Sequence, residues 1–187
     1  PPVSARHWLT PRLGDFNRQH PQVDLWLFTS FEPPNMATDS IDLAIRDDLS
    51  AQADCTFNLL CSDRLYPACH PSLLALAAEQ RVTLHGEREM DWSHWTVAGG
   101  AHVGQRDSGL NFSDPGLLLD AACNGLGIAL VSQLLAQHAH DAGLLQPLTE
   151  QRVRGANWAW LLHRDSEHNP LARHFCQWLQ SALPAGA

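Results

Sequence analysis

The chain has 187 residues and 44% of them are hydrophobic, so it can form one ordinary domain or two small lobes with a real core. Twenty acidic residues against twelve basic ones give a formal net charge of −8, which disfavours direct binding to nucleic acid or to an anionic membrane. No apolar run is long enough to span a bilayer. The five cysteines include no C-x-x-C pair, which indicates buried or idle thiols in a reducing compartment.

The first third of the chain predicts a helix followed by extended segments. A threonine-proline pair opens a helix over residues 10–20, although the pattern also allows a start near Ala5. Residues 23–29 are almost entirely apolar and predict a strand. Residues 41–45 predict a second short strand, and residues 57–69 a long extended segment.

The middle of the chain is less regular. Residues 70–74 predict the start of another helix, and the signal then weakens. A short helix with two tryptophans is predicted over residues 91–97. Residues 109–112 predict a strand that leads into the most informative part of the sequence.

The stretch from Asp114 to Ser132 predicts a helix followed by a buried strand. Asp114 is a typical N-cap, and the proline after it suits the first helical position. Gly125 can end that helix in a left-handed turn. The fully apolar residues 127–131 then predict a strand buried on both faces, so this stretch is an α/β unit.

The last third repeats this alternation. Ser132 can cap a helix through His140 that ends at Gly143, and residues 144–148 are then extended. Residues 156–163 predict the last strand. The final helix opens at Asn169-Pro170, and its apolar stripe consists of Leu171, Phe175, Trp178, Leu179 and Ala182.

Alternating strands and helices predict an α/β fold with a mostly parallel sheet covered on both sides. Residues 72–147 can form an αβ group of their own, which predicts two lobes joined by crossovers near Cys69 and Pro147. Trp26, Trp160 and Trp178 are predicted in the core. Trp92 and Trp95 are predicted to cover a lobe surface.

Five segments resemble one family, in register along nearly the whole chain. The resembling segments are residues 8–21 (WLTPRLGDFNRQHP), 41–46 (IDLAIR), 65–74 (LYPACHPSLL), 121–132 (AACNGLGIALVS) and 175–179 (FCQWL). Together they resemble the effector-binding domain of LysR-type transcriptional regulators, most of all the branch that regulates glycine cleavage and chromosomal β-lactamase.

This resemblance implies two Rossmann-like lobes joined by two crossovers, as in type 2 periplasmic binding proteins. Lobe I would comprise residues 1–70 with 149–187, and lobe II residues 71–148. The chain opens without an initiator methionine, which indicates a fragment or a processed product. The family's DNA-binding winged helix-turn-helix, and most of its first strand, would precede residue 1.

The resemblance also implies a function. The domain would sense a small-molecule effector in the cytoplasm and form a homodimer or a higher oligomer. Its dimer contact would use the first helix, residues 11–20, against a second-lobe helix, residues 115–124 or 133–140. DNA would be bound only through the missing domain, with RNA polymerase as a further partner of the full-length protein. It implies no enzymatic activity, no cofactor and no contact with a membrane.

The effector-binding residues should lie where strands end and helices begin, because open α/β sheets bind ligands there. The candidate residues are Val3, Ser4, Thr29, Ser30, Phe31, Phe112, Ser113, Asp114 and Trp158. The family usually has serine or threonine where this chain has Val3, and often D-S/T-S where it has residues 113–115. These departures favour a more apolar or differently charged ligand.

Several candidates have a structural alternative. Ser113 or Asp114 could serve only as a helix cap, and Trp158 could belong to the core. Arg46, which ends its strand, favours a structural ion pair over a contact with a ligand carboxylate. Ser4 stays open between the two roles, whereas Thr29 and Phe31 lie in a loop, where functional residues are common.

The eleven histidines do not predict a metal site, because none is spaced as H-x-x-x-H or H-E-x-x-H. The alternative function is a free-standing solute-binding protein of a transport system, which would share the fold. An upstream helix-turn-helix would favour the regulator, and a secretory signal would favour the transport protein. The sequence does not identify the effector, the target genes or the direction of regulation.

Overall fold

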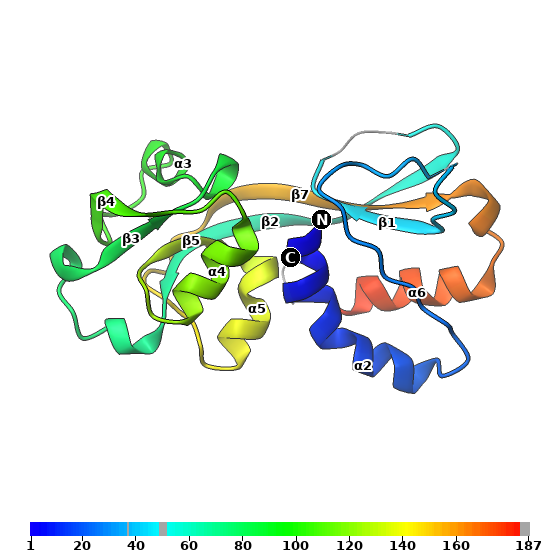
Figure 1. The fold of residues 1–187 in the computed structure, drawn as a ribbon, viewed down its shortest axis with the longest axis horizontal. Helices are drawn as coiled ribbons and strands as arrows, with labels where there is room; N and C mark the ends of the chain where they lie inside the picture. Colours follow the sequence, from blue (N-terminus) through cyan, green and yellow to red (C-terminus); the bar gives the residue numbers. More distant parts are fainter. Residues whose placement is uncertain (37, 49–51, 184–187) are drawn as a thin grey trace. The chain divides into compact units, whose positions relative to one another are not determined.

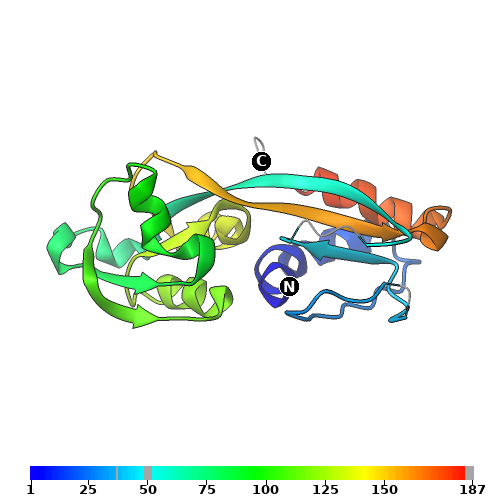
Figure 2. The same cartoon turned by 90° about the horizontal axis from the view of Figure 1, so that it is seen from above.

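The computed structural model describes residues 1–36, 38–48 and 52–183 (Figure 1). Its contacts divide the chain into unit 1, Pro1–Ser62 with Ala156–Ala187, and unit 2, Asp63–Gly155. Two long strands, β2 (Cys55–Cys69) and β7 (Val153–His163), run from one unit into the other and are hydrogen-bonded neighbours (Figure 2). Because these strands continue across both boundaries, the predicted lobe limits at residues 70 and 148 stay a prediction.

Unit 1 combines helices from both ends of the chain with parts of the long strands. Besides β2 and β7 its elements are α1 (Pro2–Ser4), a π-helical turn (Ala5–Leu9), α2 (Thr10–Gln19), β1 (Leu43–Arg46), a 3₁₀ turn (Arg164–Ser166) and α6 (Pro170–Ser181). The first helix therefore begins before Ala5, which favours the earlier of the two predicted starts. Pro11 is tolerated because the preceding turn is wider, with the Thr10 amide donating to the Ala5 carbonyl.

Aromatic packing joins α2 to α6 in unit 1. The rings of Phe16 and Phe175 meet edge to face, with centroids 5.0 Å apart, and Phe16 also contacts Trp178 at 5.2 Å. The Trp178 indole N–H donates to Asp15 at 3.3 Å. These contacts confirm the predicted apolar face of the last helix, since Phe175, Trp178 and Leu179 are all buried.

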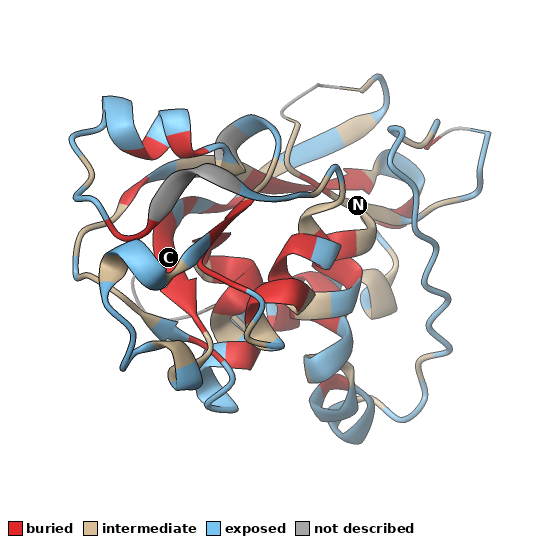
Figure 3. Ribbon diagram, turned by 60° about the vertical axis from the view of Figure 1, so that its left-hand side comes forward, coloured by how far each residue is buried: buried red, intermediate tan, exposed pale blue. Residues whose placement is uncertain are grey.

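The predicted strand at residues 23–29 is wrong. Within the described part of the chain the segment is extended but pairs with no strand. Residues 24–30 are exposed, and exposed segments are drawn pale blue in Figure 3. Trp26 is 74% exposed and Phe28 73% exposed, so the prediction of Trp26 in the core is wrong as well. The apolar run signalled burial, but no neighbouring strand supplies the hydrogen bonds or the packing surface that a strand needs.

Unit 2 contains three α-helices and most of the short strands. In addition to β2 and β7 its elements are 3₁₀ turns at Pro71–Leu73, Ala78–Gln80 and Arg88–Met90, strands β3 (Val82–His85), β4 (Gln105–Asn111), β5 (Ala129–Ser132) and β6 (Gln146–Pro147), and helices α3 (Trp92–Val97), α4 (Pro115–Cys123) and α5 (Gln133–Asp141). The helix predicted to start at residues 70–74 is a single 3₁₀ turn. Strand β3 lies where the sequence signal was weak.

The sheet is not mostly parallel. β1 pairs antiparallel with β7, and β2 pairs antiparallel with both β5 and β6. Among the described residues, β3 and β4 form a parallel ladder, extended by a parallel bridge between Thr83 and Ile128. Parallel pairing predominates where helices connect successive strands, and here the two long strands instead pair with short strands of opposite direction.

The α4–β5–α5 stretch confirms the sequence prediction. Asp114 caps α4 and Ser132 caps α5, each through its side chain. Gly125 and Gly143 have φ of +76° and +72°, the left-handed turns that end the two helices. All residues of β5 are buried, as predicted for a strand covered on both faces.

Two tryptophans predicted on a lobe surface are instead part of the core of unit 2. Trp92 is 4% exposed and Trp95 is fully buried. They pack with Leu65, Cys69, Val103, Ile128, Leu130 and Val153. Each indole N–H keeps a partner, since Trp92 donates to the Leu84 carbonyl and Trp95 to the Ala101 carbonyl, both at 2.9 Å. The short predicted helix is therefore anchored by its aromatic residues.

Candidate functional site

The start of α4 collects the predicted site residues of unit 2. Phe112 is half-buried, and its amide donates to the His85 carbonyl at 2.8 Å. Ser113 is exposed. Asp114 Oδ1 accepts hydrogen bonds from the amides of Gly116 at 2.6 Å and Leu117 at 3.2 Å. Asp114 therefore has the role of a helix cap, which was the structural alternative to a contact with the effector.

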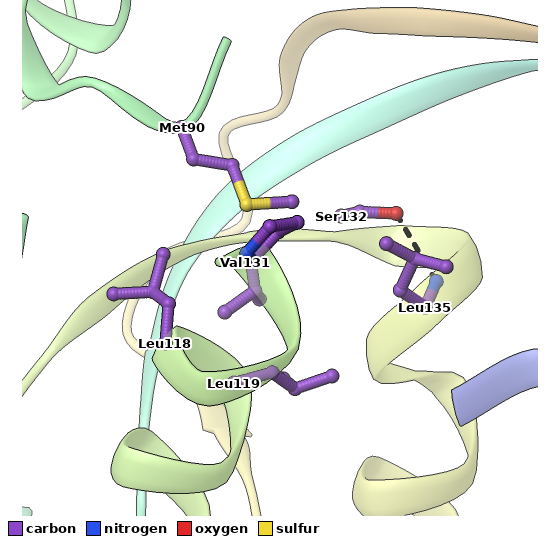
Figure 4. A pocket seen from close by; sticks show the side chains of 7 residues that line it. Met90, Leu118, Leu119, Val131, Ser132 and Leu135 are labelled. Atoms are coloured by element: carbon purple, nitrogen blue, oxygen red, sulfur yellow. Dashed lines mark hydrogen bonds between the residues drawn. The ribbon is translucent and has the colours of Figure 1, made fainter. Parts of the chain in front are cut away.

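A shallow apolar recess adjoins the start of α4 in unit 2. It is lined by Met90, Pro115, Leu118, Leu119, Val131, Ser132 and Leu135. In Figure 4 the Met90 side chain points from its loop towards Val131, between the side chains of α4 and α5. No sequence pattern indicated Met90, because its 3₁₀ turn, Arg88–Met90, lies in the segment where periodicity was weak.

A buried carboxylate holds the start of α5. Asp63 is 5% exposed, and its carboxylate accepts from the Ser132 hydroxyl, from the Leu134 amide at 3.1 Å and from the Arg64 amide at 2.8 Å. Ser132 in turn accepts from the Leu135 amide at 3.1 Å. The negative charge lies at the positive end of the α5 dipole. Sequence analysis missed Asp63, whose only signal is a charged residue inside a long predicted strand.

In unit 1 the predicted residues at the chain start are buried. Val3 is 7% exposed and Ser4 is 4% exposed. The Ser4 hydroxyl donates to the Pro1 carbonyl at 2.9 Å, so it has a local backbone partner. Helix α1 has no side-chain cap at its start. The start of α1 therefore lacks the side-chain cap that Asp114 gives α4.

The loop residues of unit 1 are at the surface. Thr29, Ser30 and Phe31 are exposed, and Ser30 Oγ accepts from the Glu32 amide at 3.0 Å. Arg46 is buried and forms an ion pair with Asp48, with N–O distances of 2.7 and 3.1 Å.

The third nitrogen of Arg46, Nη1, donates to the Glu32 carbonyl at 3.1 Å. The guanidinium therefore has the structural role that the sequence favoured.

Trp158 lies in the buried core, with 2% of its surface exposed. Its predicted position in a pocket is therefore not visible in the structure, and the core alternative fits its burial. The other predicted residues form short groups within each unit. Residues 3–4 and 29–31 belong to unit 1, and residues 112–114 to unit 2.

No group of three or more metal-binding side chains occurs in the described ranges. The five cysteines are free, and burial raises the pKa of Cys123 and Cys176 to about 11. Such thiols are protonated and unreactive at neutral pH. Among the same described residues, no helix has both the length and the apolarity needed to cross a membrane.

Comparison with known proteins identifies the family. The family model of the LysR substrate binding domain matches residues 1–184. The transcriptional activator AmpR of Citrobacter freundii is 29% identical over 186 residues, which are 94% of this chain and 62% of AmpR. The glycine cleavage system transcriptional activator of Escherichia coli K12 is 28% identical over 195 residues, covering 98% of this chain and 63% of the activator. The chain thus spans under two thirds of these relatives.

Solved structures show the same fold. The effector-binding domain from Citrobacter freundii with three amino acid substitutions superposes with a TM-score of 0.73, at 23% identity, covering 97% of this chain and 95% of that domain. CrgA, a LysR-type regulator from Neisseria meningitidis, gives a TM-score of 0.69 at 21% identity, covering 96% of this chain and 65% of CrgA. These neighbours have the type 2 periplasmic-binding-protein-like fold. The chain therefore belongs to the LysR substrate-binding-domain family, the effector-sensing regulatory modules of LysR-type regulators and not the solute-binding proteins of transport systems.

Proposed function

We propose that this domain senses a small-molecule effector for a longer LysR-type transcriptional activator or repressor that acts in the cytoplasm. The observation that carries the proposal is the family match over residues 1–184 on two compact units linked by β2 and β7. In the proposed protein an N-terminal domain outside this chain binds DNA, and this domain forms homodimers or higher oligomers. The proposed role needs no catalytic group.

Two groups of residues are proposed to contact the effector, one on each unit. Unit 1 would contribute Val3, Ser4, Thr29, Ser30 and Phe31, with Trp158 supporting them from the core. Unit 2 would contribute Phe112, Ser113 and Asp114. Support comes from the exposure of Thr29 and Ser113 and from the position of Ser113 directly before α4.

Sensing would work by differential binding. An effector that binds one arrangement of the two units or of the oligomer more tightly shifts the population towards it. A useful response needs a coupling free energy of about 1–3 kcal/mol. Since the units are joined by two continuous strands, small changes in those strands offer a direct route for the response.

A thermal-shift screen tests this proposal. Amino acids, carboxylates and cell-wall fragments are added to the purified domain, and a true effector raises the melting temperature in a concentration-dependent way. If no compound in such a screen stabilises the domain, effector sensing by this chain is contradicted. Turnover of a stabilising compound would instead indicate an enzyme.

The proposed contact residues can be tested together. Thr29→Ala combined with Ser113→Ala should abolish the effector-induced shift and leave the melting temperature of the free domain unchanged, since both side chains are exposed. Thr10→Ala combined with Ser93→Ala is the matched control, because these residues are also exposed, one in each unit. Unchanged affinity in the first double variant would place the effector elsewhere.

A further inference from the structure

We propose that the buried carboxylate of Asp63 makes α5 follow β2, so that a change in β2 on effector binding reaches the surface of unit 2 through this helix. Asp63 is then a positioning residue, because it acts through α5 and needs no contact with the effector. The transmission of an effector signal rests on the proposed function, whereas the link between β2 and α5 is a property of the free domain.

Asp63 lies where β2 enters unit 2. The strand spans Cys55–Cys69, unit 1 ends its first segment at Ser62, and unit 2 begins at Asp63. Two residues further along, Leu65 pairs antiparallel with Ser132 at the end of β5. Asp63 is therefore the first residue of unit 2 to meet any change that β2 carries.

The second long strand is packed tightly against the same part of β2. Gly155 is the last residue of unit 2 in the chain and lies on β7. A Cβ added there would lie 3.2 Å from the Leu65 side chain and 3.3 Å from the carbonyl carbon of Asp63. Such close packing leaves little room for one strand to shift without the other. Asp63 therefore belongs to a segment in which β2 and β7 move together.

The carboxylate of Asp63 connects this segment to the start of α5. Oδ2 accepts a hydrogen bond from the Ser132 hydroxyl, and Oδ1 accepts one from the Leu134 amide at 3.1 Å. The Ser132 oxygen accepts in turn from the Leu135 amide at 3.1 Å, the dashed line in Figure 4. Two amides that a helix start leaves without helical partners are thus bound to β2, directly or through Ser132.

The cap of α4 differs from this arrangement because it is local. Asp114 accepts from the amides of Gly116 and Leu117, two and three residues away in the sequence. Asp63 and Leu134 are 71 residues apart. Since α5 already has a local cap in Ser132, the contribution of Asp63 is a connection to another element.

Burial makes this connection costly to break. Asp63 is 5% exposed, so its charge has lost most of its contact with water and depends on the donors around it. Hydrogen bonds to an ionised acceptor are also stronger than neutral ones. If β2 shifts, a matching shift of α5 keeps these bonds, whereas a stationary α5 loses them. His138 and His140 are exposed on α5, so such a shift reaches the protein surface.

Native-state hydrogen exchange tests the connection in the free domain. In wild type, the slowest amides of α5 and of β2 between residues 65 and 68 should exchange through one shared opening, with equal dependence on added urea. Asp63→Asn preserves the size of the side chain but removes the charge and the acceptor of the Ser132 hydroxyl. Exchange in α5 should become about tenfold faster or more relative to α4, and should lose the urea dependence shared with β2.

A merely structural loss of stability would speed exchange in α4, α5 and β2 equally, and that result would overturn the inference. Unchanged exchange in α5 would overturn it as well. Asp141→Asn is the matched control, because Asp141 ends the same helix with its side chain 65% exposed. This variant should keep the wild-type ratio of exchange between α5 and α4.

Ser132→Ala removes the middle member of the same connection. Its effect on α5 should therefore not add to that of Asp63→Asn in the double variant, and full additivity would contradict a shared connection. If Asp63→Asn does not fold, Ser132→Ala alone should still separate the opening of α5 from that of β2.

Any amino acid, carboxylate or cell-wall fragment that stabilises the domain in the thermal-shift screen then tests the transmission. Bound to wild type, it should slow exchange in both β2 and α5. Bound to Asp63→Asn with unchanged affinity, it should slow exchange in β2 only. Equal slowing of α5 in both proteins, or a loss of affinity in Asp63→Asn, would refute the positioning role. A screen without a stabilising compound would count against the proposed function, while exchange in the free domain still decides whether Asp63 connects α5 to β2.

Discussion

Two apolar runs of similar length have opposite environments in this molecule. Residues 127–132 are buried throughout, and β5 within them pairs with β2 between Leu65 and Ala68. Residues 24–30 are all exposed, and they pair with no strand of the described chain. The first run ends at a capped helix, whereas the second continues into an exposed loop.

The difference shows that an apolar run becomes a strand only when both its backbone and its side chains find partners. β5 has a strand beside it and the helices α4 and α5 in contact with it. The hydrophobic effect rewards burial of any apolar surface, but an unpaired amide in a buried segment costs free energy. Without a neighbouring strand, residues 24–30 therefore stay in water with their backbone solvated.

Shortening a core side chain in β5 should give the largest effect. Leu130 is fully buried, so Leu130→Ala should lower the free energy of unfolding by about 2–5 kcal/mol through lost burial and the cavity left behind. The change in the free energy of unfolding is measured by urea unfolding monitored by circular dichroism. Leu117→Ala is the control, since Leu117 is on the adjacent helix but 54% exposed, and equal losses in both variants would contradict the assigned burial.

Removing the carboxylate that joins the end of β5 to the start of α5 should cause the second largest loss of stability. Asp63→Ala removes the acceptor of the Ser132 hydroxyl and the Leu134 amide, leaving polar groups buried, and should cost about 2–3 kcal/mol. Asp141→Ala is the control, because Asp141 lies on the same helix with its side chain 65% exposed. If the two variants unfold at the same urea concentration, the carboxylate of Asp63 does not hold α5.

Local signals in the sequence predicted the parts of the fold that depend on neighbours in the chain. Caps at Asp114 and Ser132 and the turn at Gly125 need only a few adjacent residues, so they could be identified directly. The direction of strand pairing depends on residues far apart in sequence, such as Tyr66 and Val131, and was predicted wrongly.

The same reasoning predicted only part of the candidate site. Ser113 and Asp114 followed from the rule that ligands meet the ends of strands and the starts of helices. Met90 and Asp63 are positioned by tertiary packing, and nothing in their sequence neighbourhood marks them. The hydrogen bonds by which Asp114 caps α4 became visible only with atomic distances.

Substitutions in the exposed run should give the smallest change in stability. Trp26 and Phe28 stack on each other with ring centroids 6.4 Å apart, but each is more than 70% exposed. Trp26→Ser combined with Phe28→Ser should therefore change the free energy of unfolding by about 0.5 kcal/mol or less, against the several kcal/mol expected for Leu130→Ala. The double variant should also be more soluble, because exposed aromatic residues on an unpaired extended segment favour association.

A loss of unfolding free energy comparable to that of Leu130→Ala, measured over a range of protein concentrations, would show that this segment is buried in solution. A concentration-dependent loss would assign the burial to a second copy of the chain, and a concentration-independent one to the domain itself.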